Sequence, residues 1–366
     1  MKEHYRCWAE IDRSALRHNA AFVREKFGPA IELLAVVKAN AYGHGMIDVA
    51  QTIADQANIF GVANLEEAIA LRAAVRNPIA ILGPALPEER AAIAEGGFIP
   101  SISTLEEARD FDRVGRGQTV AINFKIDTGM GRMGVLEEEA LAAFKEVSAL
   151  PNIKVHSVST HLPVSNEDEK FTREELRKFG KLIRQLRVEI PGDYKVHVLQ
   201  TAGVLAFAEE PFEIVRPGML IYGISSLPEF QNALYPVMTW KTRIALIREM
   251  PAGHGISYGR TFITPRKMRV ATLSCGYADG YPRHLSNRGI SVLVRGQRCA
   301  LLGRVTMDLI MIDVSHLTGA TVGDEVVLMG RQGDEEMCCA ELAERAETIT
   351  WEITTRIGAR VRRVYV

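Results

Sequence analysis

Short apolar runs alternate with amphipathic helical stretches from about residue 12 to residue 220, and this alternation limits the folds open to the chain. In the helical stretches, such as 171–190, apolar residues recur at intervals of three and four. The candidate strands lie at 31–37, 59–63, 79–82, 98–102, 120–126, 154–159, 195–199 and 212–216. Strands that alternate with helices pair in parallel, with the helices as crossovers. Eight such units predict an α/β fold of the (β/α)8 TIM-barrel type, although periodicity alone also allows a doubly wound open sheet.

The pattern changes after about residue 230. Apolar runs at 268–275, 290–296, 308–314 and 324–330 are separated by Gly, Asp and Asn instead of helices, which is typical of a mostly antiparallel β domain. Only 338–347 and 350–357 look helical. We therefore predict a barrel over 12–230 and a β-rich C-terminal domain over 231–366, which an N-terminal strand within 1–11 joins.

Charge, hydropathy and cysteine usage exclude several classes of protein. The 44 Lys and Arg residues against 45 Asp and Glu leave a formal charge of -1, so no basic excess indicates nucleic acid. We find no signal peptide and no apolar run long enough to span a membrane. The five cysteines are odd in number and form no CxxC pair, which argues against a disulfide framework and against a zinc site. We therefore expect a cytoplasmic protein without a structural metal.

Lys38 ends a strongly apolar strand, and the carboxyl ends of the strands are where a barrel keeps its active site. Partial burial there lowers the pKa of a lysine and leaves the neutral amine as a nucleophile. The alternative is a strand-end lysine that reaches solvent. Small residues follow it, and Tyr42, four positions on, offers a hydroxyl suited to a phosphate oxygen.

Four other polar residues follow candidate strands in the same way. Arg132 lies in a Gly-rich turn and suits a carboxylate, which an arginine can bind through two nitrogens, unless it is an ordinary surface arginine. His161 faces the barrel mouth or is a histidine satisfied by backbone groups. Thr201 begins an apolar helix, so it contributes to a phosphate site or is a simple helix cap. Arg216 ends the last strand, before Pro217.

Several segments resemble, in order and in approximate spacing, the motifs of the alanine racemase family, which are fold-type III enzymes that use pyridoxal 5'-phosphate. AVVKANAYGHG (35–45) resembles the family's cofactor-lysine signature, and DTGMGRMG (127–134) resembles the segment whose arginine binds the substrate carboxylate. GHGISYG (253–259) resembles the segment that carries the second catalytic base. CGYADGYPR (275–283) and GRVTMDLIMIDV (303–314) resemble segments that line the site near it.

The resemblance implies a role for each matching residue. Lys38, which holds the cofactor as a Schiff base, and Tyr258 are the implied catalytic bases. The implied cofactor-binding residues are Lys38, Tyr42, His161, Thr201, Arg216, Gly218, Met219 and Tyr222. The implied substrate-binding residues are Arg132 and Met307, and the implied supporting residues are Lys125, carbamylated in several relatives, His197 and Asp308.

Arg216 and Tyr258 carry the functional prediction. Arg216 is implied to face the pyridine nitrogen and cannot accept a proton from it, so that nitrogen stays unprotonated. The carbanion at Cα is then not fully delocalised over the ring, and a proton returns to the same carbon. Racemisation needs proton carriers on both faces of that carbon, and the family supplies the tyrosine from the second subunit of a homodimer. The resemblance thus implies interconversion of L-alanine and D-alanine for peptidoglycan.

Three alternatives remain at this point. A broader-specificity racemase would share these residues. A barrel-type amino acid decarboxylase would pair the pyridine nitrogen with a carboxylate, whereas this chain has Arg216. A non-catalytic cofactor-binding barrel would lack the β-rich domain. The chain also departs from the family's commoner pattern at Gln200-Thr201, where Asn-Ser is usual, and in the loop 162–168.

Overall fold

The computed structural model describes residues 5–115, 117–207, 212–225 and 227–366. The chain divides into two compact units. The first unit consists of Ser14–Ala41 and Met46–Tyr235. The second unit consists of the chain's first segment as far as Arg13, the short segment Tyr42–Gly45, and Pro236–Val366. Of the predicted N-terminal strand, residues 1–4 lie outside the described residues.

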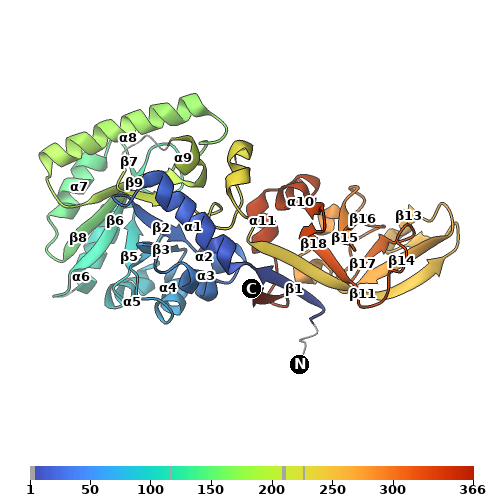
Figure 1. Cartoon of the computed structure of the whole chain (residues 1–366). Helices are drawn as coiled ribbons and strands as arrows, with labels where there is room; N and C mark the ends of the chain where they lie inside the picture. The colour runs from blue at the N-terminus through green and yellow to red at the C-terminus, as the bar shows by residue number, and fades with distance from the viewer. Residues whose placement is uncertain (1–4, 116, 208–211, 226) are drawn as a thin grey trace. The chain divides into compact units, whose positions relative to one another are not determined.

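The first unit is a closed barrel of parallel strands, with helices around it (Figure 1). The barrel strands are β2 (Glu32–Val36), β3 (Ile59–Val62), β4 (Ile79–Ile81), β5 (Ile99–Ile102), β6 (Val120–Asp127), β8 (Ile153–Ser159), β9 (Lys195–Gln200) and β10 (Ile214–Arg216). They pair in chain order, and β10 returns to β2 with Ile214 opposite Glu32. This closure confirms the predicted (β/α)8 barrel and excludes the open sheet.

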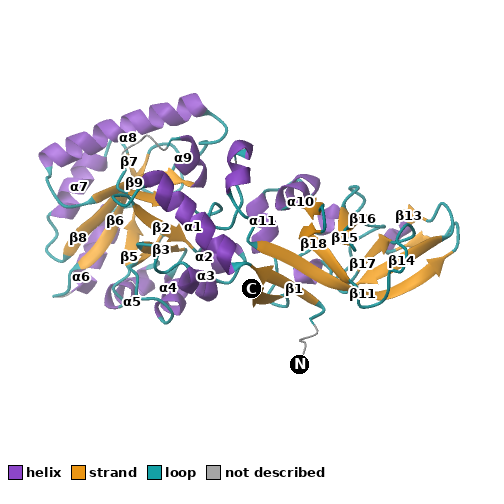
Figure 2. Ribbon diagram, in the orientation of Figure 1, coloured by secondary structure: helices purple, strands orange, loops and turns teal. Residues whose placement is uncertain are grey.

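The helices of this unit cover the barrel, as the purple ribbons around the orange strands show (Figure 2). The helical segments of this unit are α1 (Arg13–Phe27), α3 (Met46–Thr52), α4 (Leu65–Arg72), η1 (Pro87–Glu89), α5 (Arg90–Glu95), α6 (Leu105–Gly115), α7 (Ala140–Ser148), α8 (Glu169–Glu189), α9 (Thr201–Ala206) and η2 (Pro228–Ala233). The short segment labelled α2 (Lys38–Tyr42) has left-handed backbone angles instead. The helix α8 begins at the N-cap Asp168, whose side chain accepts a hydrogen bond from the Phe171 N–H. Its buried face runs from Thr172 to Leu186 at intervals of three and four residues, so the predicted amphipathic helix is confirmed.

The second unit is mostly β. Its strands are β1 (Cys7–Ile11), β11 (Met238–Met250), β12 (Gly255–Ile256), β13 (Phe262–Ile263), β14 (Met268–Leu273), β15 (Ser291–Val294), β16 (Gln297–Ala300), β17 (Ile310–Asp313), β18 (Glu325–Gln332), β19 (Glu335–Met337) and β20 (Arg362–Tyr365). Its helices are η3 (Tyr258–Arg260), η4 (Tyr277–Asp279), η5 (Arg283–Leu285), α10 (Cys339–Arg345) and α11 (Thr350–Thr355). The first strand, β1, lies between the antiparallel β11 and the parallel β20. Ala9 at its centre and Trp240, the residue opposite it on β11, are fully buried.

Two features differ from the sequence prediction. A two-residue strand, β7 (Val135–Leu136), follows the Gly-rich turn and pairs with the end of β6. The strand β2 ends at Val36, so Lys38 is not its last residue but the first residue of the next segment. In the part of the chain that the structure describes, no helix combines the length and apolarity needed to cross a membrane.

Candidate active site

The segment that begins at Lys38 is a left-handed turn. Each of the residues 39–42 has a positive φ, at 52°, 53°, 54° and 52° in order. L-residues pay about 1–2 kcal/mol each for this conformation because Cβ crowds the following carbonyl oxygen. Four in succession therefore need support from the surrounding structure.

Glu67 of α4 supplies part of that support. One of its carboxylate oxygens accepts the Ala39 N–H at 2.7 Å and the other accepts the Ala63 N–H at 2.8 Å. Asn40 Oδ1 accepts the Met46 N–H at 2.9 Å, where the chain leaves the turn. Sequence reasoning missed Glu67, because a glutamate in the first turn of a helix is ordinarily explained by the cap alone.

Glycine is required immediately after the turn. A Cβ on Gly43, whose φ is +85°, would lie 2.1 Å from the Thr354 carbonyl oxygen. The Gly43 carbonyl also accepts a 2.9 Å hydrogen bond from Arg363 Nε. Close backbone approach therefore explains the glycine at position 43.

Four cationic side chains gather at the carboxyl ends of the barrel strands. Burial and then the charge of Arg132 lower the pKa of Lys38, with a smaller effect from Arg216, while Glu67 opposes the shift. Burial lowers the pKa of Lys125 strongly, and Arg216 and Arg132 lower it further. Such mutual effects require proximity, so the predicted lysine and arginines lie in one electropositive site.

Arg216 is held firmly from two strands. Its Nη2 donates to the carbonyls of Thr160, at 2.7 Å, and Val198, at 2.8 Å, and its Nε is buried without a partner among the described residues. Burial and the charge of Arg132 lower its pKa to about 10, so it stays a cation near neutral pH.

The two predicted histidines are neutral. Burial, followed by the charges of Arg216 and Lys125, lowers the pKa of His161 to about 2. Burial also lowers the pKa of His197 far below its usual range. His197 Nε2 lies 3.2 Å from Ser157 Oγ, while its Nδ1 has no partner within the described parts of the chain.

Asp127, at the end of β6, organises the turn that carries Arg132. Its Oδ1 accepts the N–H groups of Gly129 and Gly131 at 2.9 and 3.1 Å, and its Oδ2 accepts the Arg132 N–H at 3.2 Å. These backbone hydrogen bonds lower the pKa of Asp127 against the opposing effect of burial. The backbone of this loop is thus fixed while the Arg132 side chain remains exposed.

The ends of β9 and β10 bring the predicted phosphate-binding residues together. Thr201 Oγ1 accepts the Gly218 N–H at 2.9 Å, which joins the start of α9 to the turn after β10. Met219 and Tyr222 are buried in that turn, and Tyr222 Oη donates to the Val36 carbonyl at the end of β2, at 2.9 Å. Burial raises the pKa of Tyr42 to about 12, so its hydroxyl keeps its hydrogen.

The remaining predicted residues lie in the second unit. Tyr258 begins η3 and is 71% exposed, and the residues beside it, Ser257 and Gly259, have φ of 62° and 72°. Met307 is also exposed. Asp308 forms a 2.9 Å ion pair with Arg360.

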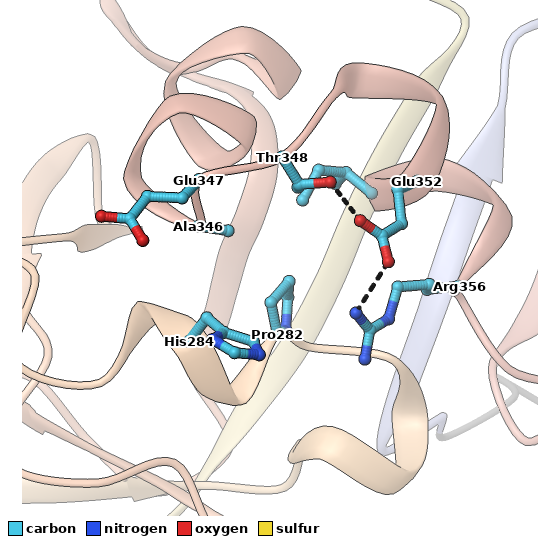
Figure 3. Close-up of a pocket in the computed structure, with 8 residues that line it drawn as sticks. Pro282, His284, Ala346, Glu347, Thr348, Glu352 and Arg356 are labelled. Atoms are coloured by element: carbon cyan, nitrogen blue, oxygen red, sulfur yellow. Dashed lines mark hydrogen bonds and ion pairs between the residues drawn. The ribbon is translucent and has the colours of Figure 1, made fainter.

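A pocket of about 200 Å³ in the second unit contains none of these residues (Figure 3). Its lining includes Glu352, which accepts hydrogen bonds from Thr348 and, at 3.1 Å, from Arg356. His284, on η5, and Glu347, next to Thr348, also line it, and the Glu347 carboxylate points away from Glu352 and Arg356 (Figure 3). Among the described residues, no group of three or more His, Cys, Asp and Glu side chains could hold a metal ion.

The fold and the site define a (β/α)8-barrel enzyme with a lysine of lowered pKa beside two arginines at the carboxyl ends of the barrel strands. Residues 11–226 match the alanine racemase N-terminal domain, and residues 237–365 match the alanine racemase C-terminal domain. The chain belongs to the alanine racemase family.

Individual relatives match over almost the whole chain. The alanine racemase of Halothermothrix orenii is 42% identical over 368 residues, which cover 98% of this chain and 96% of the relative. The crystal structure of alanine racemase from Bacillus anthracis with bound L-Ala-P has a TM-score of 0.92 at 33% identity and covers 100% of this chain and 96% of the other. Alanine racemase from Bartonella henselae, solved with covalently bound pyridoxal phosphate, has a TM-score of 0.90 at 28% identity, over 99% and 100% of the two chains.

The residues of the barrel mouth fit pyridoxal 5'-phosphate, the cofactor of this family. Arg216 Nε and His197 Nδ1 are buried polar atoms without partners among the described residues, and burial and the charges of Arg132 and Arg216 lower the pKa of both Lys38 and Lys125. A phosphate and a carboxylate would balance this positive charge. Lys38, with its lowered pKa, is the amine suited to a covalent bond with the aldehyde of the cofactor.

Proposed function

We propose that this protein interconverts L-alanine and D-alanine, with pyridoxal 5'-phosphate held covalently on Lys38. The observation that carries the proposal is the lowered pKa of Lys38 among Lys125, Arg132 and Arg216 at the barrel mouth. When bound, the cofactor acts as an electron sink for the electron pair left at Cα. Thr201, Gly218, Met219, Tyr42 and Tyr222 are the proposed phosphate contacts.

Arg216 controls the fate of that electron pair in this proposal. Because its pKa is about 10 and two carbonyls fix its Nη2, it keeps its protons and its orientation. An arginine against the pyridine nitrogen leaves that nitrogen unprotonated, which favours return of a proton to Cα over transamination or decarboxylation. His197, which is buried and whose pKa the charge of Arg216 helps to lower, is the proposed support of Arg216.

Arg132 is the proposed ligand of the substrate carboxylate, with the backbone N–H of Met307 as a second contact. The turn that Asp127 organises fixes the Arg132 backbone before substrate arrives, which reduces the entropy lost on binding. Lys125, which is buried and whose pKa is strongly lowered, is the proposed support of Arg132.

Two bases act on opposite faces of Cα. With the cofactor bound, Lys38 Nζ would exchange the Cα proton of the D-enantiomer, and Tyr258 of a second copy would exchange that of the L-enantiomer. His161, which is neutral, can accept a hydrogen bond from that tyrosine. The exposure of Tyr258, Tyr277 and Met307 supports a homodimer in which a second copy covers these side chains.

The setting of the reaction is also a proposal. All five cysteines are free thiols, which supports a reducing, cytoplasmic location. Supply of D-alanine for peptidoglycan is the role that family membership supports.

The test is an assay of D-product from a panel of L-amino acids with the holoenzyme and with Lys38→Ala. We expect D-alanine from L-alanine, little D-product from larger side chains, and no racemisation by Lys38→Ala. Release of CO2 without D-product would indicate a decarboxylase, and equal rates across the panel would indicate a broad-specificity racemase.

A further inference from the structure

Glu175 is a buried carboxylate that the proposed reaction does not use. It lies on the inward face of α8 and is 3% exposed, whereas glutamates are rarely buried without full pairing. Its Oε1 accepts a hydrogen bond from Thr128 Oγ1 at 3.3 Å. Its Oε2 is buried and has no partner in the described residues.

Thr128 links this carboxylate to the strand end that holds Arg216. Thr128 Oγ1 lies 2.8 Å from Thr160 Oγ1. A hydroxyl has one hydrogen, so when Thr128 donates to Glu175, Thr160 must donate to Thr128. The Thr160 carbonyl in turn accepts the 2.7 Å hydrogen bond from Arg216 Nη2.

Glu175 also packs against the turn that carries Arg132. A Cβ on Gly129 would lie 2.7 Å from Glu175 Oε1, so the carboxylate lies directly against the backbone there. Gly129 has a φ of +152°, and its N–H donates one of the hydrogen bonds that the Asp127 carboxylate accepts. A shift of Glu175 would therefore move the turn between Asp127 and Arg132.

We propose that Glu175 is a positioning residue that, through Thr128, aligns the Arg132 turn with the Thr160 carbonyl that holds Arg216. The proposal rests on the proposed function, because it takes Arg132 as the ligand of the substrate carboxylate. In this proposal Glu175 acts through Thr128 and the backbone of the Arg132 turn, not by contact with substrate or cofactor.

The protonation state of Glu175 should modulate this alignment. Burial raises its pKa to about 7; the hydrogen bond from Thr128 lowers it. The charged groups that face it are Asp127 at the end of β6, which raises the pKa, and Lys178 on α8, which lowers it, while Thr160 at the end of β8 adds no charge. The ionised carboxylate is the stronger acceptor, so the turn is held more firmly above neutral pH than below it.

Propionate isolates the carboxylate site, because it has no amine and stays ionised between about pH 6 and pH 8.5. We would measure its competitive inhibition constant across that range with the holoenzymes of wild type, Glu175→Gln and Thr128→Val. Glu174→Gln is the matched control, since Glu174 is an exposed neighbour on the same helix. Thr128→Ser retains the hydroxyl and should rescue the effect of Thr128→Val.

We expect Glu175→Gln and Thr128→Val to raise the inhibition constant about fivefold near pH 8. Near pH 6, where wild-type Glu175 is protonated, the inhibition constants of wild type and Glu175→Gln should become equal. The kcat should change less than KM, and Glu174→Gln should match wild type. Should Glu175→Gln fail to fold in a thermal unfolding control, Thr128→Val still tests the link.

Two failures are distinguishable. Wild-type racemisation together with unchanged propionate inhibition in both variants would overturn the role of Glu175 alone. A wild-type holoenzyme that does not racemise alanine would contradict the proposed function itself.

Discussion

Gln200 Nε2 donates a hydrogen bond to Ser165 Oγ at 2.7 Å. A second hydrogen bond joins the same nitrogen to the Leu162 carbonyl at 3.2 Å. Gln200 and the loop 162–168 are two of the places where, on the sequence resemblance, the chain departs from the family's commoner pattern. The departures are therefore coupled, because the glutamine at the end of β9 binds the loop after β8.

Replacement of Gln200 by Met should loosen that loop. The side chain keeps its length but loses both N–H donors, and each lost hydrogen bond should lower the stability of the docked loop by about 1 kcal/mol. We expect faster amide hydrogen exchange over 162–168 and an increase of about three- to tenfold in KM for alanine, with cofactor affinity unchanged. Gln185→Met, on the exposed face of α8, is the control, and equal exchange in both variants would contradict the coupling.

The sequence was sufficient to predict the site residues that lie at strand ends, but not the residues whose hydrogen bonds fix the backbone around them. Lys38, Arg132, His161 and Arg216 each follow an apolar run, so barrel geometry alone predicts that they converge. Glu67 could not be found in this way, because its partners depend on the conformation of the turn at Ala39. Of the left-handed residues 39–42, only the asparagine has a side chain that favours this conformation, so propensity does not predict the turn.

Glu175 shows a second limit of sequence reasoning. Its position on the buried face of α8 follows from helical periodicity, yet a glutamate there is a polar residue at an apolar position. Only the tertiary structure shows that Thr128, 47 residues away, is its partner. The strand β11 was not among the predicted runs, because MTWKTRIALIREM mixes charged and apolar residues and its burial alternates along only part of its length.

Strain in the left-handed turn predicts that one substitution there will raise the stability of the protein and lower its activity. Ala39 is exposed with φ 52°, so Ala39→Gly should remove the Cβ penalty and stabilise the protein by about 1 kcal/mol. The same change should lower kcat, because Lys38 would be less firmly oriented. Ala92→Gly, at an exposed position of the helix α5, should instead destabilise by about 0.5–1 kcal/mol. Chemical denaturation of both variants checks the opposite signs.

The buried histidines predict that the cofactor-free protein loses stability in mild acid. The pKa of His161 is about 2 in the folded state and about 6.5 in the unfolded state, so the unfolded state binds more protons between these values. The free energy of unfolding should thus fall as pH drops below about 6.5, by up to about 1.4 kcal/mol per pH unit from this group. His161→Asn should flatten the slope, whereas His18→Asn, at an exposed position, should not. Parallel slopes for wild type and His161→Asn would refute the assignment.

The exposed Tyr258 hydroxyl is the group on which racemisation depends in the two-base proposal. Tyr258→Phe removes one hydroxyl from a 71% exposed side chain, so the fold and the visible absorbance of the bound cofactor should not change. Loss of one general base should lower the racemisation rate by about 10²- to 10⁴-fold. In deuterated water, exchange of the Cα hydrogen should persist for D-alanine, which uses Lys38, and disappear for L-alanine. Tyr235→Phe, also at an exposed tyrosine, should leave both exchange rates unchanged. Wild-type rates in both directions for Tyr258→Phe would exclude this tyrosine as the second base.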